Sequence, residues 1–449
     1  MSFPRFIQAV LLLVAGLAAV PSGWARTYEV LYSFTGGADG ASPEAGLALD
    51  SAGNLYGTTV GTTYAYDRAT GTQLTTGTTA GSVFKLSPGG DFTLLYNFGA
   101  GGTNGSYPAG GLVRDLAGNL YGATSSGGAS PNPCSVGWFG SLGSDPFDGC
   151  GTVFKVDANG NFSVLYSFSG NNSCWQGCTP LAPLTLDAAG NLYGATYLGG
   201  SKDCSGVYPK LNSLGGVLPS DCGVVFKLDT TAKEIVLRHF GDGHKQGDFP
   251  NSGLIFDAAG NLYGTAGGGG IYRGGGDGGN DDGGAGAVFE LDPAGNETVL
   301  YFFNPLVSPV AFPNAGLIQD AAGNFYGTAD YLFKLDPQGT LTQLNSPGYP
   351  TSALILDAAG NLYGTTPNGG SGISNPICGP GYGCGTVFRV DPSGNLTTLY
   401  DFSGETDGAE SQAPVIMDAE GNLYGTTAYG GTISDVCPAG CGVVFKITP

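Results

Sequence analysis

Residues 360–366 read Gly-Asn-Leu-Tyr-Gly-Thr-Thr, and this block decides the fold because close copies of it run through the whole chain. A repeat at a spacing of tens of residues is typical of solenoids, propellers and other arrays. The copies, one of which has Phe in place of Leu, begin at Gly53, Gly118, Gly190, Gly260, Gly323, Gly360 and Gly421. They indicate seven structural units.

Each unit contains four short apolar runs separated by turn residues. In the sixth unit, run A ends at Asp357, run B is the block itself, run C is Thr386–Val390 and run D ends at Phe402. Short runs with period-2 alternation, bounded by Gly, Pro, Asn and Asp, predict strands. In the A–B turn, Asp is expected to cap backbone N–H groups while Gly adopts a positive φ.

The two ends of the repeat array complement each other. The chain opens with a D run, Val30–Phe34, before any A run, and it closes with a C run, Val443–Lys446, that no D run follows. If the first run completes the last unit, no sheet edge is left open. We therefore expect an all-β, seven-bladed β-propeller with four-stranded antiparallel blades, closed by its N-terminal strand and forming a single domain over residues 26–449.

The composition limits the partners that the protein can have. The chain carries 36 Asp and Glu against 16 Lys and Arg, a formal charge of −20. Nucleic acid requires a cationic surface, so we expect no nucleic-acid partner. The 82 glycines and 27 prolines fit a protein with many turns.

Residues 1–25 have the pattern of a signal peptide. Arg5 supplies a basic start, Ala9–Val20 an apolar stretch, and Gly23–Ala25 a small-x-small cleavage site. The apolar stretch is shorter than the roughly 20 residues of a spanning helix, although a retained membrane anchor is the alternative. We expect a secreted protein, extracellular or periplasmic, without a transmembrane anchor after cleavage.

The ten cysteines fall into five pairs that are close in sequence. An even number of cysteines in an exported chain predicts disulfides, whereas zinc thiolates are the alternative that the shortest spacings permit. The pairs are Cys134 with Cys150, Cys174 with Cys178, Cys204 with Cys222, Cys378 with Cys384, and Cys437 with Cys441. They would either hold recognition loops in shape or protect them from proteases.

The repeating pattern Gly-Asn-Leu-Tyr-Gly-Thr-Thr, Gly-Thr-Val-Phe-Lys-Leu and Leu-Tyr-x-Phe resembles the GloVer tandem repeats of exported bacterial proteins, over essentially the whole mature chain. It is more loosely similar to the propeller repeats of two-component regulator sensors. The resemblance implies a propeller at the bacterial surface or in the periplasm. No reaction or ligand is assigned to that family, so no functional residue is carried over.

The B–C and D–A loops are expected on one face, where nearly all the variation in loop length lies. Loops on a rigid scaffold commonly carry function, and exposed Tyr and Trp side chains suit stacking on sugar rings. The alternative is that these rings pack within their own insertions. The candidate ligand-binding residues are Trp138, Trp175, Tyr197, Tyr272, Tyr382 and Tyr429.

Two acidic loops are weaker candidates for chemistry. The loop at residues 274–284 offers Asp277, Asp281 and Asp282 as oxygen ligands for calcium, without the spacing of an EF-hand. We otherwise expect no cofactor. In the second loop, His244 stands beside Asp242 and Asp248, as a general base would.

From the sequence we expect an exported, non-catalytic recognition or scaffold propeller that binds a polysaccharide or an extracellular protein on its loop face. The alternative is a propeller enzyme, a lyase or glycoside hydrolase, that acts on extracellular polysaccharide. A purely structural envelope protein is a third hypothesis. Retention of a glycan distinguishes the first, and release of new chain ends the second.

Overall fold

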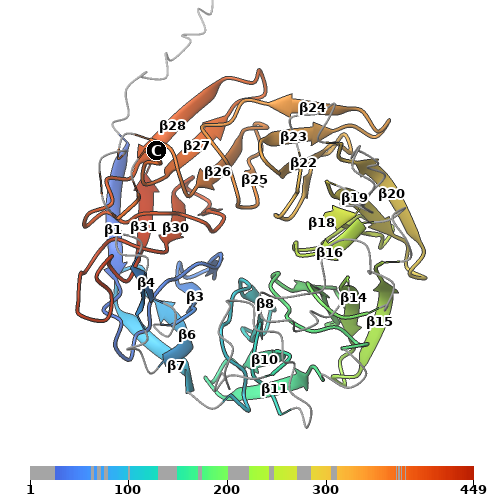
Figure 1. The fold of residues 1–449 in the computed structure, drawn as a ribbon, viewed down its shortest axis with the longest axis horizontal. Helices are drawn as coiled ribbons and strands as arrows, with labels where there is room; N and C mark the ends of the chain where they lie inside the picture. Colours follow the sequence, from blue (N-terminus) through green and yellow to red (C-terminus); the bar gives the residue numbers. More distant parts are fainter. Residues whose placement is uncertain are drawn as a thin grey trace, which may run out of the picture.

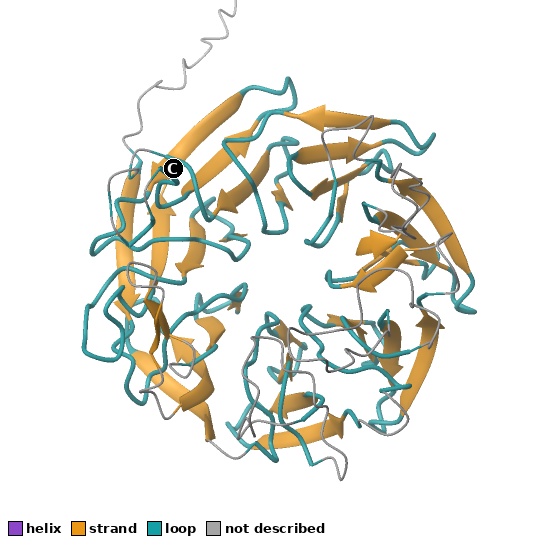
Figure 2. Cartoon of the chain, in the orientation of Figure 1, coloured by secondary structure: helices purple, strands orange, loops and turns teal. Residues whose placement is uncertain are grey.

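The computed structural model describes residues 26–61, 65–67, 72–74, 79–99, 102–129, 149–169, 174–200, 222–241, 247–269, 285–304, 311–370, 372, 375, 377–379 and 381–448. For residues 65–67, 72–74 and 79, only the backbone is described. The described residues contain strands and loops and no helix (Figure 2). None of them forms a helix long and apolar enough to cross a membrane.

Seven antiparallel sheets follow one another around a ring, with the short A strands innermost and the D strands outermost (Figure 1). Blade 1 consists of β2 (Ala48–Leu49), β3 (Leu55–Thr59), β6 (Thr79–Leu86) and β7 (Phe92–Gly99). Blade 2 consists of β8 (Val113–Arg114), β9 (Leu120–Thr124), β10 (Thr152–Val156) and β11 (Phe162–Ser167). Blade 3 consists of β12 (Thr185–Leu186), β13 (Leu192–Thr196), β14 (Val224–Leu228) and β15 (Glu234–His239). Each is written from strand A to strand D.

Blades 4 to 7 continue the ring. They are β17 (Ile255–Phe256), β18 (Leu262–Gly269), β19 (Ala287–Leu291) and β20 (Glu297–Phe302); β21 (Ile318–Gln319), β22 (Phe325–Thr328), β23 (Leu332–Leu335) and β24 (Leu341–Leu344); β25 (Ile355–Leu356), β26 (Leu362–Thr366), β27 (Thr386–Val390) and β28 (Leu396–Asp401); β29 (Ile416–Met417), β30 (Leu423–Thr427), β31 (Val443–Thr448) and β1 (Thr27–Ser33). The prediction of a seven-bladed propeller is confirmed.

Two features add to the predicted four strands per blade. In blade 4, β18 extends over a glycine-rich segment and pairs with a fifth strand, β16 (Gly247–Pro250), through Asp248 and Gly268. In blade 1, the B–C insertion contains a hairpin of β4 (Ala65–Asp67) and β5 (Thr72–Leu74). Both additions lie in the loops that the sequence marks as variable.

The N-terminal strand closes the ring as predicted. β1 pairs antiparallel with β31, from Thr27 opposite Thr448 to Ser33 opposite Val443. Three strands of blade 7 therefore come from the end of the chain and the fourth from its beginning (Figure 1).

The A–B turn explains the Asp, Gly, Asn and Tyr of the repeat. In blade 6, the Asp357 carboxylate accepts the backbone N–H of Asn361 at 2.8 Å, its side-chain amide at 2.7 Å, and the Tyr363 hydroxyl at 3.0 Å. Gly360 has a φ of +83°. Burial alone would raise the pKa of Asp357, but these hydrogen bonds outweigh it and lower that pKa. The Asn and Tyr bonds recur in all seven blades.

The second glycine of each block makes room for the Phe of strand C. Gly364 lies opposite Phe388 in the register of β26 and β27. A Cβ atom at Gly364 would stand only 2.7 Å from the ring of Phe388, which is fully buried. In the other six blades, a second ring at the end of strand D of the preceding blade packs edge-on against the strand-C Phe, as Phe402 does on Phe445. At Phe388 the preceding blade supplies Leu344 instead. Burying each ring contributes about 2 kcal/mol, so these pairs join the blades.

The outermost strands also join neighbouring blades. Tyr96 stacks on Phe162 with ring centroids 3.6 Å apart, and Tyr28 stacks on Tyr400 at 3.8 Å. Between blades 2 and 3 a hydrogen bond replaces the stack, because the Tyr166 hydroxyl donates to Glu234 at 2.7 Å. Burial raises the pKa of Glu234 to about 7, although the bond from Tyr166 lowers it in part.

We expect the substitution Glu234→Gln to remove a pH-dependent part of the stability. The folded pKa, about 7, lies above the unfolded value of 4.5. The carboxyl group therefore contributes stability that is complete below about pH 4.5 and is lost as the pH rises through 7. Between pH 5 and pH 8, the free energy of unfolding measured with urea should fall by about 1 to 2 kcal/mol more in wild type than in the variant. An equal loss in both proteins would contradict this account.

Candidate functional site

The D–A loops and the B–C loops meet at one end of the ring, which we call the loop face. Short antiparallel bridges join three of the D–A loops to the start of the next B–C loop. They pair Ser106 with Ser126, Cys178 with Leu198, and Ala409 with Tyr429. The loop face is therefore held together by backbone hydrogen bonds close to the sheets.

One position of the loop face recurs in every blade, just before the innermost strand. In six blades it is followed by Pro and in the seventh by Ser. We call these seven residues the entry ring: Ser42, Tyr107, Thr179, Phe249, Phe312, Tyr349 and Glu410.

The backbone of the entry ring is strained. Six of its members have a φ between 54° and 61°, and only Tyr349 does not. A left-handed conformation is uncommon outside Gly and costs free energy, so it persists only where the surroundings fix it. Each of these six residues donates its backbone N–H to a carbonyl group of the preceding blade. The carbonyl belongs to a residue at the start of strand C, which we call the root of strand C. Phe249 donates to Cys222 at 2.8 Å, and Glu410 to Cys384 at 2.8 Å.

The root of strand C is shaped to make these bonds. Each root carbonyl is followed by a Gly of positive φ, such as Gly223 at 89°. A Cβ atom there would stand 2.7 Å from Cδ of Pro250, the proline that follows Phe249. Blade 5 has no such Gly, because only residues 329–331 separate its strands B and C. That difference explains why Tyr349, in the next blade, escapes the left-handed conformation.

Cysteines occupy four of the six roots. Cys384 forms a disulfide with Cys378, and Cys441 with Cys437, as predicted. Cys150 and Cys222 are also disulfide-bonded. Their predicted partners, Cys134 and Cys204, lie outside the described residues. The disulfides thus hold the carbonyl groups that fix the entry ring.

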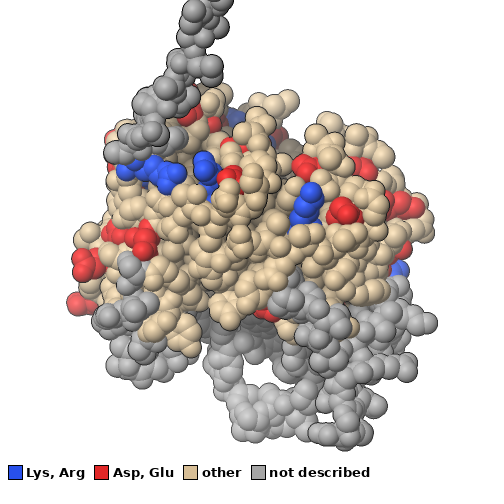
Figure 3. All heavy atoms as spheres, turned by 90° about the horizontal axis from the view of Figure 1, so that it is seen from above, with Lys and Arg blue, Asp and Glu red and all other residues tan. Residues whose placement is uncertain are grey.

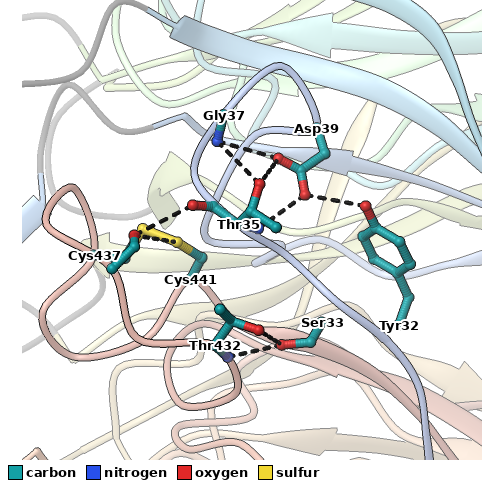
Figure 4. The surroundings of a disulfide bond; sticks show 9 residues. Tyr32, Ser33, Thr35, Gly37, Asp39, Thr432, Cys437 and Cys441 are labelled. Carbon is teal, nitrogen blue, oxygen red and sulfur yellow. Dashed lines mark hydrogen bonds between the residues drawn. A yellow bond between two sulfur atoms is a disulfide. The ribbon is translucent and has the colours of Figure 1, made fainter.

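The Cys437–Cys441 disulfide shows this arrangement in detail (Figure 4). The Cys441 carbonyl accepts the backbone N–H of Ser42 at 2.9 Å. The neighbouring D–A loop is closed by Asp39, which accepts hydrogen bonds from Thr35 and from the Tyr32 hydroxyl (Figure 4). A strand-D tyrosine, a D–A loop and a B–C root therefore form one unit.

The predicted disulfide between Cys174 and Cys178 is not formed in the structure, although both side chains are buried. The Cys174 carbonyl accepts backbone N–H groups from Gly177 at 2.7 Å and Gly200 at 3.0 Å. The same turn occurs in blade 7, where Glu405 takes the place of Cys174. Backbone hydrogen bonds therefore hold this turn in both blades.

Replacing both Cys378 and Cys384 by Ala should loosen one entry-ring residue selectively. The cysteines are six residues apart, and opening so short a loop costs about 2 kcal/mol on the chain-entropy model. Hydrogen exchange at the Glu410 amide, which donates to the Cys384 carbonyl, should accelerate at least tenfold. The Ser42 amide, held by the intact Cys437–Cys441 pair, is the internal control. Equal acceleration at both amides would contradict a local role.

Aromatic side chains dominate one arc of the entry ring. Phe249, Phe312 and Tyr349 occupy it in the consecutive blades 4, 5 and 6. Phe312 is 51% exposed and Tyr349 is 60% exposed. Contiguous exposed apolar surface marks interaction sites in folded proteins.

Further side chains support this arc. Phe249 stacks on Tyr197 with ring centroids 5.0 Å apart, and Tyr331 lies 6.4 Å from Tyr349. Asp330, the residue before Tyr331, donates its backbone N–H to the carbonyl of Ala311, the residue before Phe312, at 3.1 Å. Burial raises the pKa of the Asp330 carboxyl group.

The candidate ligand-binding residues divide into three groups. Trp175 and Tyr382 are exposed, at 48% and 65%, and Trp175 rests on His239 with ring centroids 4.7 Å apart. Tyr197 and Tyr429 are partly buried and pack against the cores of their blades. Trp138 and Tyr272 lie outside the described residues.

Sequence reasoning missed Phe312 and Tyr349, the two most exposed rings of the arc. The signal in the sequence was a Pro four residues before the Leu of an A run, with an aromatic residue directly before that Pro. Phe312-Pro313 and Tyr349-Pro350 are two examples. It is visible only when the repeats are aligned on strand A instead of strand B.

The catalytic and metal candidates are only partly placed. Asp248 is 3% exposed beside Phe249, whereas Asp242 and His244 lie outside the described residues. Asp277, Asp281 and Asp282 lie outside them as well. Within the described ranges, no group of three or more His, Cys, Asp or Glu residues stands close enough to hold a metal ion.

Charged side chains are sparse on the surface. Figure 3 shows Lys, Arg, Asp and Glu scattered among uncharged residues on one side of the molecule. Five lysines of strand C are accounted for, because each lies over the strand-B Tyr of its blade, as Lys227 does 5.3 Å from the ring of Tyr193.

Comparison with known proteins gives a family and a fold. The family model described as "Gloeobacter/Verrucomicrobia repeat" matches residues 21–208, 149–331 and 277–449. No curated protein sequence matches the chain. The structure is similar to a catalytically inactive virginiamycin B lyase from Staphylococcus aureus with quinupristin, at 11% identity and a TM-score of 0.54, covering 94% of this chain and 99% of the lyase. A streptogramin B lyase is similar at 10% identity and a TM-score of 0.50, covering 94% and 97%. At these identities the likeness shows the propeller fold alone.

Proposed function

The chain belongs to the Gloeobacter/Verrucomicrobia repeat family, and from its loop face we propose that it is an exported recognition module that binds carbohydrate without cleaving it. The observation that carries the proposal is the arc of Phe249, Phe312 and Tyr349, in which Phe312 and Tyr349 are more than half exposed. Phe249 and Phe312 have a left-handed backbone, and the carbonyl that holds Phe249 belongs to a disulfide-bonded cysteine, Cys222. A pre-organised surface loses less entropy on binding than a flexible one.

The chemistry of the loop face favours a sugar ligand over a protein partner. A stable protein interface buries roughly 800 Å² per partner around a well-packed apolar core. Here, apart from Phe312 and Tyr349, the exposed large apolar residues among those described come from separate parts of the ring. Single aromatic faces set among polar residues suit the apolar faces of sugar rings, while the hydroxyls remain hydrated or bond to neighbouring oxygens. The disulfides and the predicted signal peptide support export.

Catalysis on polysaccharide is the second candidate function. Two carboxylate side chains, Asp248 and Glu410, belong to the segments of the entry ring and are only 3% and 1% exposed. Buried carboxyl groups beside a binding surface are common general acids and bases. An enzyme would release new chain ends, whereas a recognition module only retains the glycan.

One experiment separates the two functions. The protein without residues 1–25 is incubated with soluble neutral and acidic polysaccharides, and affinity-gel retardation is measured together with release of reducing or unsaturated ends. We expect retardation without new ends. New ends would establish the enzyme instead, and neither signal would leave a protein partner or a structural role and overturn the proposal.

A further inference from the structure

The connections on the loop face are shortest at one sector. The B–C connection of blade 5 consists of residues 329–331, whereas the next shortest, in blade 7, consists of residues 428–442. The D–A connection from blade 5 to blade 6, residues 345–354, is also the shortest of its kind, the next being residues 100–112. Two short connections therefore meet side by side.

The two most exposed rings of the arc stand at this place. We call Phe312, Asp330, Tyr331 and Tyr349 the aromatic sector. The backbone hydrogen bond from Asp330 to Ala311 links Asp330 to the segment of Phe312. The ring centroids of Tyr331 and Tyr349 lie 6.4 Å apart. Tyr331 is partly buried and packs on the blade-5 core, so it supports Tyr349 from below.

The position of the aromatic sector determines how a ligand reaches it. Phe312 and Tyr349 stand in adjacent blades, so a chain that stacks on both crosses from one blade to the next. The B–C connection of blade 5 and the D–A connection that follows it are each the shortest of their kind, so neither can extend far beside that chain. A chain lying across such an opening is bound through its middle and needs no free end.

The negative charge of the protein determines which class of polysaccharide it can bind. The protein carries a formal charge of −20, and the charged member of the aromatic sector is an aspartate. Polyuronates bring one carboxylate per sugar and would be repelled, because like charges close together are costly. Neutral sugars avoid that cost and retain the stacking.

We propose, building on the proposed recognition function, that the aromatic sector binds an internal segment of a linear, neutral polysaccharide. Phe312 and Tyr349 each stack on a sugar ring, and chain ends take no part in recognition. The partner is thereby defined as a polymer of neutral sugars, as opposed to a terminal sugar, a polyuronate or a folded protein.

The test compares wild type with Phe312→Ala and Tyr349→Ala, using hydroxyethyl-cellulose, mixed-linkage β-glucan and polygalacturonate as probes. Leu116→Ala is the control, because Leu116 is also an exposed large apolar residue but lies in the A–B turn of blade 2, at the opposite face. We expect a neutral glucan to retard wild type, each sector variant to bind it at least fivefold more weakly, and the control to bind within twofold. Circular-dichroism melts establish that all variants are folded.

Chain length supplies the second arm of the test. Calorimetric titration with oligosaccharides of the retained glucan should give affinity that rises at least tenfold from trisaccharide to hexasaccharide. Equal affinity for both lengths, or tighter binding of polygalacturonate, would overturn the inference. Unchanged binding by both sector variants would also overturn it while the proposed function stands. Binding to none of the polysaccharides would overturn both.

Discussion

A protein that lacks residues 27–33 should fail to fold cooperatively. These residues form β1, which provides the outermost strand of blade 7 and pairs with the whole of β31. Their loss also removes Tyr28, which stacks on Tyr400 at 3.8 Å and on Phe445 at 5.7 Å. Burial of Tyr28, Val30 and Tyr32 alone contributes roughly 5 kcal/mol. That is as large as the whole stability of many domains, about 5 to 15 kcal/mol.

Urea denaturation followed by circular dichroism measures this effect. The control is a protein that begins at residue 26, which retains β1 and should unfold in one cooperative transition. A synthetic peptide of residues 26–36 added to the truncated protein should restore part of that transition, because the open edge of β31 accepts a strand. Cooperative unfolding of the truncated protein, within about 2 kcal/mol of the control, would show that the ring does not depend on its closing strand.

Gly385→Ala should be among the most destabilising single substitutions in the chain. Gly385 follows the root carbonyl of Cys384 and has a φ of 97°. An added Cβ would overlap the backbone oxygen of Thr366 and stand 3.1 Å from that of Pro367. Left-handed backbone costs about 1 to 2 kcal/mol for Ala, and overpacking about 1 to 3 kcal/mol more. We expect a total loss of about 2 to 5 kcal/mol.

Gly394→Ala is the matched control for this substitution. Gly394 has a similar φ of 83°, but a Cβ there would meet nothing within 4 Å. Its loss should therefore be limited to the conformational cost of about 1 to 2 kcal/mol. If urea denaturation shows the same loss of unfolding free energy in both variants, close packing at the root of strand C adds nothing to the stability of the entry ring.

Most of the ring could be predicted because the repeat encodes local physics. Asp357, Gly360, Asn361 and Tyr363 all serve one turn and its flanking strands, so seven copies predict seven identical hairpins. The closing strand followed from the order of the runs alone, with Val30–Phe34 at one end and Val443–Lys446 at the other.

The site was less accessible because it depends on contacts between blades. The strain at Phe249 comes from a carbonyl of blade 3, at Cys222. The exposure of Tyr349 depends on the short connections around blade 5. Cys174 and Cys178 have the spacing of a disulfide, yet backbone hydrogen bonds hold that turn without one. In each case the decisive neighbour is distant in the sequence or belongs to the backbone.

Hydrogen exchange of the wild-type protein, with and without the polysaccharide that retards it most, tests the recognition surface most directly. The account predicts protection in the segments around Phe249, Phe312 and Tyr349, with none in the A–B turns such as 357–361 at the opposite face. Protection confined to the A–B turns or to the outermost strands would contradict it, because the ligand would then bind away from the loop face.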